Sequence, residues 1–470
     1  MSQSIPRKTA PWDNRASAIC SLSGAGVGLR VTEREATNTT ASRETFSSRW
    51  GMVLALLGVS IGLGNFWRFP YMMGIFGGGA FLVIYLVVVL AFGVPAMLAE
   101  LALGRATRRG PVQAFEQAGL TAGKPIGLLL YVGVGMAMTY YLVVLGWLFA
   151  FFIVSVGRLA GVAELTPDTF GELHARWPLQ MACSAVVAAA AAAVVSRGVR
   201  AGIERISRLF LPAFGVLTVF LAIWAMTLPG AAGGLRYLFT VDFASMTPRA
   251  VMAAVGQAFF SLGLGGTFLV IYGSYLPDDA PLRTRAFTTA AGDVAASILA
   301  VLVVMPVAFA YGLSPASGPP LLFEVLPVAF AQMPGGAFFG ALFFLGLTCI
   351  AFLSGVAAVE VLVGTLVDTR GWSRQRTAWG VSAVLVVVGY PAMRSLDYIV
   401  WSDLVWGSTM QPVGSAAAMS ALAWGLGHRV ARKQLEHEGE LPFWIGYWVF
   451  AIQYVVPGAV IIALLSGWLG

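Results

Sequence analysis

The hydrophobic positions of this sequence fall into long runs that are separated by short polar connectors. Each run has about the 20 residues that a helix needs to cross a hydrocarbon core of about 30 Å. Because backbone polar groups in lipid must be paired within the segment, and the runs lack strand-like alternation, each run is expected to be a helix. The pattern predicts eleven transmembrane helices, over residues 50–74, 79–104, 126–157, 179–196, 206–228, 249–276, 286–312, 336–367, 375–393, 398–427 and 442–469.

The composition agrees with this pattern. Hydrophobic residues make up 58% of the 470 residues and charged residues only 11%, whereas soluble proteins carry about 25% charged residues. The charges gather in the connectors, so the expected fold class is an all-α polytopic membrane protein.

The basic residues predict how the chain is oriented. With a cytoplasmic N-terminus, the cytoplasmic connectors hold 16 Lys and Arg residues, four each within 105–124 and 197–208, two within 283–285 and three each within 370–376 and 429–433. The opposite connectors hold five, at Arg158, Arg176, Arg236, Arg249 and Arg394. The positive-inside rule therefore predicts a multi-pass protein of the cell inner (plasma) membrane, N-terminus cytoplasmic and C-terminus outside. This bias accounts for the net charge of +7 without a nucleic-acid partner.

The polar ends and scattered ligand-type residues suggest little further chemistry. Residues 1–42 lack the apolar core of a signal peptide, and they are expected to be either a disordered cytoplasmic tail or an overextended start. The cysteines and histidines are too widely spread for a metal or redox motif. They are Cys20, Cys183, Cys349, His174, His428 and His437.

Two predicted spans contain Gly-Leu-Gly in their middle, at Gly62–Gly64 in the first and Gly263–Gly265 in the sixth. A glycine costs about 1 kcal/mol relative to alanine inside a helix. Two interpretations are open: the glycines permit close helix packing, or the helix unwinds there. Unwound carbonyls would suit a cation such as sodium, and half-helix N-termini would suit a carboxylate.

The positions of the two breaks favour unwinding. They lie five spans apart, which is typical of an inverted repeat whose discontinuous helices mark the binding site. The prediction is a transporter domain over 43–470, with five-helix repeats at about 50–228 and 249–427 and an extra helix at 442–469.

Polar residues beside the breaks fit a binding site. Ser60 and Asn65 flank the first break, and Ser261 and Thr267 flank the second. Asp293 lies about eight residues into the seventh span, where a carboxylate is costly unless it faces an interior site. A snorkelling charge near the helix end is the alternative, which that depth disfavours.

Other polar residues within the spans have simpler expectations. Glu100 and Glu360 are expected to be structural. Tyr140 and Tyr141 lie midway along the third span, where a hydroxyl needs a partner. Packing against a neighbouring helix and facing a ligand are both open for this pair.

Three segments resemble the neurotransmitter:sodium symporter family. They are Gly62-Leu-Gly-Asn-Phe-Trp-Arg-Phe-Pro70, Gly77-Gly-Gly-Ala-Phe81 and Glu100-Leu-Ala-Leu-Gly-Arg105. The resemblance runs from about Arg43 to the C-terminus and fits the eleven-span bacterial members. It implies a sodium-coupled symporter that imports a neutral amino acid by alternating access.

The resemblance implies two sodium sites. The first would use the Ser60 carbonyl, Asn65, Ser261 and Asp293, together with the substrate carboxylate. Because Asp293 would supply the negative charge that chloride brings elsewhere, and Ser297 stands at the neighbouring position, transport is expected to be independent of chloride. The second would use Gly58, Ile61, Ile350 and Ser354. Leu353 departs from the family pattern there, so this site would be weaker, have a different stoichiometry or not take sodium.

The resemblance also implies a substrate site. Gly62 stands where monoamine carriers have Asp, which favours a substrate with its own carboxylate. The pocket has many small residues, which favours a bulky hydrophobic or aromatic side chain. The implied residues are Val59, Ser60, Gly62, Leu63, Gly64, Ala137, Tyr141, Phe260, Ser261, Gly263, Gly266, Ser354 and Ala358.

Two gates follow from the same resemblance. Outside, Arg68 would pair with Asp397 or Asp403, of which we prefer Asp403, and Phe260 and Tyr141 would form a thin lid. Inside, Arg43 would pair with Asp368, supported by Tyr275 and Ser274. An ordinary positive-inside flank is the alternative for Arg43.

Other functional classes have less support. No repeated filter motif suggests a channel, and no catalytic constellation suggests an enzyme. An amino-acid sensor or a carrier not coupled to sodium, on the same fold, remains the alternative because of Leu353. Sodium, the amino acid and the lipid bilayer are the expected partners, and no organic cofactor or obligatory protein partner is implied.

Overall fold

The computed structural model describes residues 45–162, 169–316, 318, 321–436, 447 and 450–458. The predicted tail at 1–42, Arg43 and most of the predicted helix at 442–469 lie outside these residues. Within the part described, all regular structure is helical, as the apolar runs predict. The ends of the predicted repeats remain predictions.

Six continuous helical segments are long and apolar enough to cross a membrane. They span Gly79–Thr107, Gly123–Leu159, Trp177–Ser196, Ala201–Met226, Leu282–Ala310 and Gly336–Arg370. Two bent pairs also qualify, Arg49–Ser60 with Gly64–Ile75 and Arg374–Arg394 with Leu396–Gly425, which raises the count to eight if each pair is one span. The second pair turns through 119°. The chain therefore reverses there, and the two arms correspond to the predicted spans at 375–393 and 398–427.

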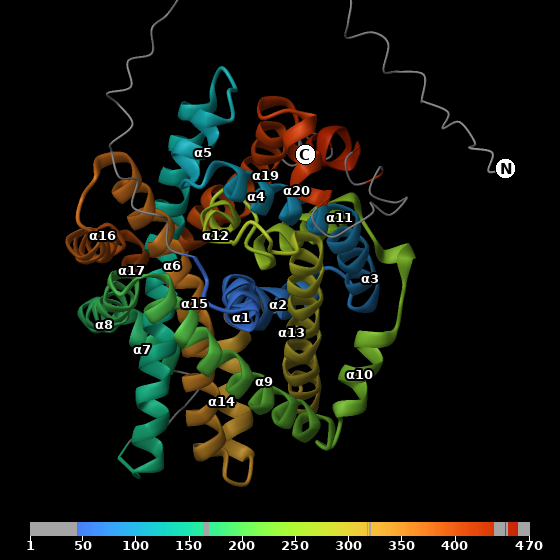
Figure 1. Cartoon of the computed structure of the whole chain (residues 1–470). Coiled ribbons are helices and arrows are strands. Elements are labelled where there is room, and N and C mark those ends of the chain that lie inside the picture. The colour runs from blue at the N-terminus through green and yellow to red at the C-terminus, as the bar shows by residue number, and fades with distance from the viewer. Residues whose placement is uncertain are drawn as a thin grey trace, which may run out of the picture. The chain divides into compact units, whose positions relative to one another are not determined.

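The helices are connected in the order that the predicted spans require (Figure 1). The first half comprises α1 (Arg49–Ser60), η1 (Gly64–Arg68), α2 (Phe69–Ile75), α3 (Gly79–Val88), η2 (Val89–Gly93), α4 (Val94–Thr107), α5 (Pro111–Gln117), α6 (Gly123–Leu159), α7 (Thr169–Ala175), α8 (Trp177–Ser196), η3 (Val199–Glu204), α9 (Arg205–Met226) and α10 (Ala231–Phe239).

The second half begins with α11 (Pro248–Ser261), which follows the short η4 (Phe243–Ser245). It continues with α12 (Phe268–Ser274), α13 (Leu282–Ala310), α14 (Leu321–Gln332), α15 (Gly336–Arg370), α16 (Arg374–Val388), α17 (Tyr390–Arg394), α18 (Leu396–Ser402), η5 (Asp403–Thr409), α19 (Met410–Ser420), η6 (Ala421–Gly425), α20 (His428–Glu436) and η7 (Ala451–Val455).

The first break is short. Helix α1 starts at a Ser48 cap, whose side chain accepts a hydrogen bond from the Gly51 N–H, and it ends where Ile61 turns to an extended conformation. The chain resumes as a helix within a few residues, bent by 45° from α1. Pro70 lies in the first turn of α2, directly after the π-helical turn Gly64–Arg68.

The second break is longer and is built on glycine. Helix α11 ends at Ser261 and α12 begins at Phe268. Between them Gly263, Gly265 and Gly266 have φ angles of 64°, 145° and 70°. Residues with a Cβ avoid this region of backbone space, so the glycines that the sequence places there permit the irregular segment.

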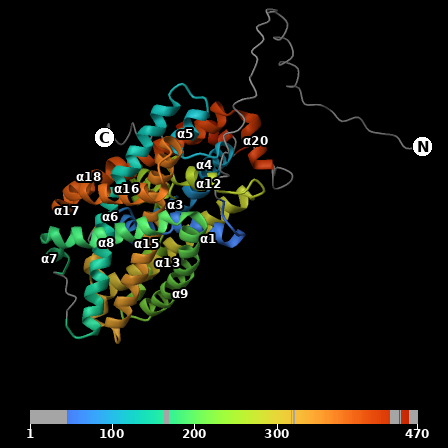
Figure 2. The same cartoon turned by 60° about the vertical axis from the view of Figure 1, so that its left-hand side comes forward.

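The breaks lie inside the bundle, where their backbone is shielded from lipid. Helix α1 packs against α9, α13 and α15, and Figure 1 shows it enclosed by these helices. Helices α8 and α16 lie side by side at one flank (Figure 1 and Figure 2). The outer faces carry exposed apolar side chains such as Leu209, Val216 and Val387, as a surface in contact with lipid requires.

Candidate transport site

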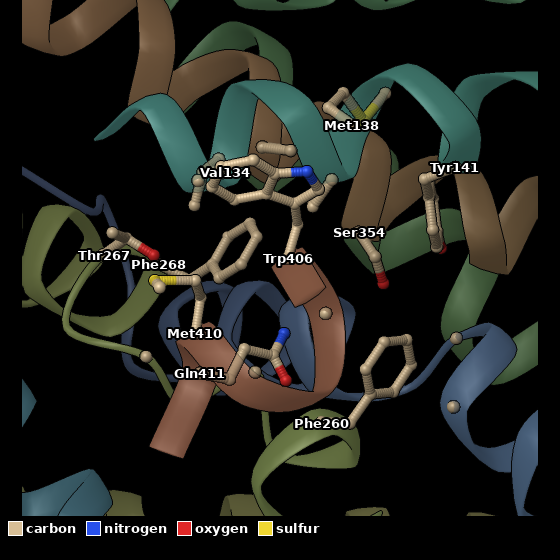
Figure 3. Close-up of a pocket in the computed structure, with 18 of the residues that line it drawn as sticks. Val134, Met138, Tyr141, Phe260, Thr267, Phe268, Ser354, Trp406, Met410 and Gln411 are labelled. Carbon is tan, nitrogen blue, oxygen red and sulfur yellow. The ribbon is translucent and has the colours of Figure 1, made fainter. Parts of the chain in front are cut away.

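A cavity lies where the two breaks meet α6, α15 and α19 (Figure 3). Its volume is about 90 Å³. Eleven predicted residues line it: Val59, Ser60, Gly62, Leu63, Gly64, Ala137, Tyr141, Phe260, Gly263, Ser354 and Ala358.

Two predicted lining residues face elsewhere. The Ser261 hydroxyl donates to Asp293 instead. Gly266 packs against the backbone of α19, so a Cβ on it would lie 2.6 Å from the Gly414 carbonyl oxygen. Neither residue is part of the cavity wall.

Twelve further residues line the cavity: Leu130, Gly133, Val134, Met138, Tyr140, Gly265, Thr267, Phe268, Trp406, Gly407, Met410 and Gln411. The contribution of η5 and α19 is new relative to the sequence-based prediction. The amide of Gln411, within the predicted span at 398–427, was the available signal.

The space beside Gly62 is limited by its neighbours. A Cβ at Gly62 would lie 2.7 Å from the Ser354 hydroxyl oxygen and 3.5 Å from the Tyr141 hydroxyl oxygen. Tyr141 donates its own hydrogen bond to the Ala351 carbonyl at 3.0 Å, while its ring lines the cavity. Of the two possibilities for this tyrosine, the structure combines a ring at the cavity with a hydroxyl that pairs with a neighbouring helix.

A buried polar cluster adjoins the first break. The Asn65 amide nitrogen donates to Asp293 Oδ1 at 2.7 Å, to the Ser297 hydroxyl at 2.9 Å and to the Ser261 hydroxyl at 3.0 Å. Ser261 donates in turn to Asp293 at 2.8 Å. Asp293 is fully buried, so it faces the interior and does not snorkel.

Tyr85 completes this cluster from α3. Its hydroxyl donates to Asp293 Oδ2 at 2.9 Å. The sequence offered no signal for this contact, because a tyrosine in an apolar span can pair with any neighbouring helix.

The Asn65 amide is oriented with its oxygen away from the carboxylate. Its Oδ1 accepts a hydrogen bond from the Gly62 N–H at 2.9 Å. Ser60 links the two breaks, since its hydroxyl lies 3.2 Å from the Leu262 carbonyl oxygen. The side chain of Asn65 thereby fixes the backbone of the first break to the polar cluster.

A second group of oxygens lies at the other side of the first break. The Ser354 hydroxyl is 3.3 Å from the Gly58 carbonyl, 3.2 Å from that of Val59 and 3.5 Å from that of Ile61. Leu353, which is buried, points its side chain at Gly58, with Cδ1 3.3 Å from the position of a Cβ there. The position where the family pattern has a hydroxyl is therefore filled by hydrocarbon. Ile350 lies one turn before Ser354 on α15 and is also buried.

Arg68 lies above the cavity among several partners. Its guanidinium donates to Gln257 Oε1 at 3.0 Å, and its Nε is 3.9 Å from Asp403 Oδ2. Its carbon Cζ is 4.8 Å from the centre of the Phe260 ring. Asp403 also accepts a hydrogen bond from Tyr140 at 2.8 Å. Of the two acids considered for Arg68, the structure brings Asp403 to it and leaves Asp397 exposed in the first turn of α18.

The described residues expected at the inner gate lie near the C-terminal end of α15. Asp368 accepts a hydrogen bond from the Gly110 N–H at 2.9 Å. Tyr275 donates to Glu360, which also pairs with Arg374. The buried Ser274 bonds within its own helix. Arg43 lies outside the described residues.

The two intramembrane glutamates hold helices together. Glu360 joins α12, α15 and α16 through Tyr275 and Arg374. Glu100 accepts a hydrogen bond from the Gly265 N–H at 2.9 Å and so anchors the second break to α4. Both contacts agree with the structural role expected for them.

Comparisons with known proteins bear on this geometry. The model of the "Sodium:neurotransmitter symporter family" matches residues 43–165 and 162–464. The chain is 31% identical over 450 residues to the uncharacterized sodium-dependent transporter YhdH of Bacillus subtilis, covering 90% of this chain and 97% of that one. It is 30% identical over 339 residues to the mouse sodium-dependent neutral amino acid transporter SLC6A17, covering 63% of this chain and 45% of the mouse protein.

The fold is also found among solved structures. The crystal structure of MhsT in complex with L-phenylalanine is similar with a TM-score of 0.83 and 32% identity, over 90% of this chain and 99% of MhsT. The family model and the Bacillus relative each cover most of the chain. The chain therefore belongs to the sodium:neurotransmitter symporter family and is a sodium-dependent membrane transporter with that family's helical fold.

Proposed function

We propose that the protein is a sodium-coupled symporter that imports a neutral, hydrophobic or aromatic amino acid by alternating access. The observation that carries this proposal is an apolar cavity between two broken helices. Next to the first break, the buried Asp293 carboxylate accepts hydrogen bonds from Asn65 and Ser261. Such breaks are where secondary transporters bind substrate and ions.

Gly62 supports an amino acid over a monoamine as substrate. Gly62 has no side chain, and a Cβ there would lie 2.7 Å from the Ser354 hydroxyl oxygen, so the protein itself places no carboxylate at this position. The substrate would bring its own carboxylate to the freed backbone amides of the break, where an anion is favoured. The L-phenylalanine bound by MhsT and the neutral amino acids named for the mouse relative support this class.

The first sodium would bind between the substrate carboxylate and the polar cluster. The Ser60 carbonyl, Asn65, Ser261 and Asp293 offer oxygen ligands, which hard cations prefer. A 180° turn of the Asn65 amide would direct its oxygen to the ion. An ionised Asp293 would balance the ion's charge, and uptake would then be unaffected when chloride is replaced by gluconate.

The second sodium site would be the weaker one. Gly58, Ile61 and Ile350 would contribute carbonyls and Ser354 its hydroxyl, while Leu353 contributes only hydrocarbon. We propose that one ion is held firmly and that a second, if bound, is held weakly.

The gates would lie on either side of this site, in the cell inner (plasma) membrane. With a cytoplasmic N-terminus and the C-terminus outside, Arg68 and Asp403 would close the outer path above Phe260 and Tyr141. Asp368 would close the inner path with Arg43, supported by Tyr275 and Ser274. The inward sodium gradient and the membrane potential, worth about 2.3 kcal/mol per charge at 100 mV, would drive uptake.

Uptake into proteoliposomes across an amino-acid panel, with external sodium against choline, tests the proposal. Accumulation of leucine, phenylalanine, tyrosine or tryptophan that requires sodium is expected. Specific binding without accumulation would instead favour the amino-acid sensor, and accumulation that is equal in choline would favour a carrier not coupled to sodium.

A further inference from the structure

One wall of the cavity is formed by η5 and α19 together with Val134 of α6 and Phe268 of α12, and Figure 3 shows it opposite Ser354 and Tyr141. We call this wall the α19 arm and define it by Val134, Phe268, Trp406, Met410 and Gln411. Three of these side chains are aromatic or sulfur-containing, and such side chains pack well against a flat ring. The single amide in the arm belongs to Gln411.

The backbone fixes where Gln411 lies. A Cβ at Gly414 would be 2.1 Å from the Gly265 carbonyl oxygen, so α19 rests directly on the second break. A Cβ at Gly265 would lie 3.3 Å from Gln411 Cα. Glu100 holds the same Gly265 from the other side through its N–H. These contacts set Gln411 at the cavity wall without help from its own side chain.

The amide oxygen of Gln411 lacks a partner. Gln411 Oε1 is buried and has no hydrogen bond within the part of the chain that is described, and the same holds for Trp406 Nε1. In the view of Figure 3 the Gln411 amide is directed towards the side of the cavity where Phe260 lies. Buried polar atoms are nearly always paired in native structures, and a few convergent polar groups in an apolar pocket are what orient a ligand.

We propose that Gln411 accepts a hydrogen bond from the far end of the substrate side chain, so that the transporter selects aromatic amino acids with a donor on the ring, such as tyrosine or tryptophan, over phenylalanine. This inference rests on the proposed function and narrows its substrate class. The aromatic and sulfur-containing side chains of the α19 arm pack against the substrate ring, and the Gln411 amide oxygen accepts a hydrogen bond from the donor on that ring.

Equilibrium binding to the full chain in sodium, measured for matched ligand pairs, tests the inference. Tyrosine and phenylalanine differ only in the hydroxyl, and tryptophan and 3-benzothienylalanine differ only in N–H against sulfur. Because one hydrogen bond to a neutral group is involved, we expect the donor-bearing member of at least one pair to bind about fivefold to tenfold more tightly. The pair that shows the preference identifies the phenol or the indole as the donor.

The substitution Gln411→Met keeps the length of the side chain and removes the acceptor. It is expected to bring the ratio within each pair close to one, because the two members of a pair share every contact except the one to the lost acceptor. Met410→Leu is the matched control, because it alters the shape of the same arm without a polar group and should change both members of a pair equally.

Two outcomes would overturn the inference. One is a ratio near one in the unmodified protein, which needs no variant, and the other is an unchanged preference in a folded Gln411→Met protein. Failure of every amino acid in the panel to bind would instead refute the proposed function. The two failures are thus distinguishable.

Discussion

Two groups of oxygen atoms border the first helix break, and they differ in charge. On one side, the Asp293 carboxylate is surrounded by Asn65, Ser261 and Tyr85, all within 3.0 Å. On the other side, Ser354 faces backbone carbonyls at 3.2–3.5 Å, beside the hydrocarbon of Leu353. The chain thus concentrates its negative charge in the first group, and the proposed coupling to sodium depends mainly on that group.

The largest effect is expected from Asp293→Asn. Breaking a buried, hydrogen-bonded charge interaction costs about 3–5 kcal/mol, so sodium-dependent substrate binding should weaken by about a hundredfold or more. Sodium titrations of amino-acid binding measure this loss directly. Asp397→Asn is the control, because Asp397 is exposed and is not among the residues that line the cavity. Equal sodium dependence in the Asp293→Asn and unmodified proteins would show that the two groups do not differ as proposed.

A smaller loss is expected from Ser354→Ala in the second group. A hydrogen-bonding group that faces a charge contributes about 1.5–3 kcal/mol, and the lower end of that range corresponds to a fall in sodium affinity of about tenfold if Ser354 contacts an ion. Thr348→Val on the same helix is the control, since the Thr348 hydroxyl donates to the Phe344 carbonyl of its own helix. If Ser354→Ala and Thr348→Val behave alike in sodium titrations, the second group takes no ion.

The substitution Leu353→Thr should strengthen sodium binding at the second group and so reduce its difference from the first. Threonine would add the missing hydroxyl beside Gly58 and increase sodium affinity by about fivefold, as expected for one added polar contact of about 1 kcal/mol. The Hill coefficient for sodium should rise towards two. Leu353→Val is the matched control, because it has threonine's shape without the hydroxyl and should cause no such gain. Identical sodium curves for the Thr and Val variants would contradict the proposed effect of Leu353.

The sequence predicts the parts of this site that depend on local chemistry. The irregular segment at 262–267 follows from glycines at positive φ, and the buried position of Asp293 follows from the cost of a charge inside a span. These properties belong to single segments, so a reading of periodicity and residue type identifies them.

The remaining parts depend on which helices meet. Tyr85 reaches Asp293 across 208 positions of the chain, and nothing near Tyr85 indicates that partner. Gln411 lines the cavity only because Gly414 lets α19 rest on Gly265. The Arg68 Nε lies 3.9 Å from Oδ2 of Asp403, the acid preferred from the sequence, whereas Asp397 is exposed in the first turn of α18. Tertiary contact decides the positions of Tyr85 and Gln411, and a single sequence does not show which helices will meet.

The smallest effect is expected from Ser297→Ala, within the first group itself. The Ser297 hydroxyl accepts one of several hydrogen bonds from the Asn65 amide nitrogen, while Asp293 and Ser261 accept the others. Losing one contact among several should weaken sodium affinity by only about threefold to fivefold, near 1 kcal/mol or less. Sodium titrations of binding to the Ser297→Ala and Asp293→Asn proteins compare the losses in sodium affinity. The comparison shows whether the ion depends mainly on the Asp293 carboxylate or equally on all oxygens of the group. Since Asp293 is the fully buried charge to which Asn65, Ser261 and Tyr85 all donate, the effect of Ser297→Ala should be the smaller by more than tenfold, and comparable losses would instead assign the ion's charge balance to the whole hydrogen-bonded group.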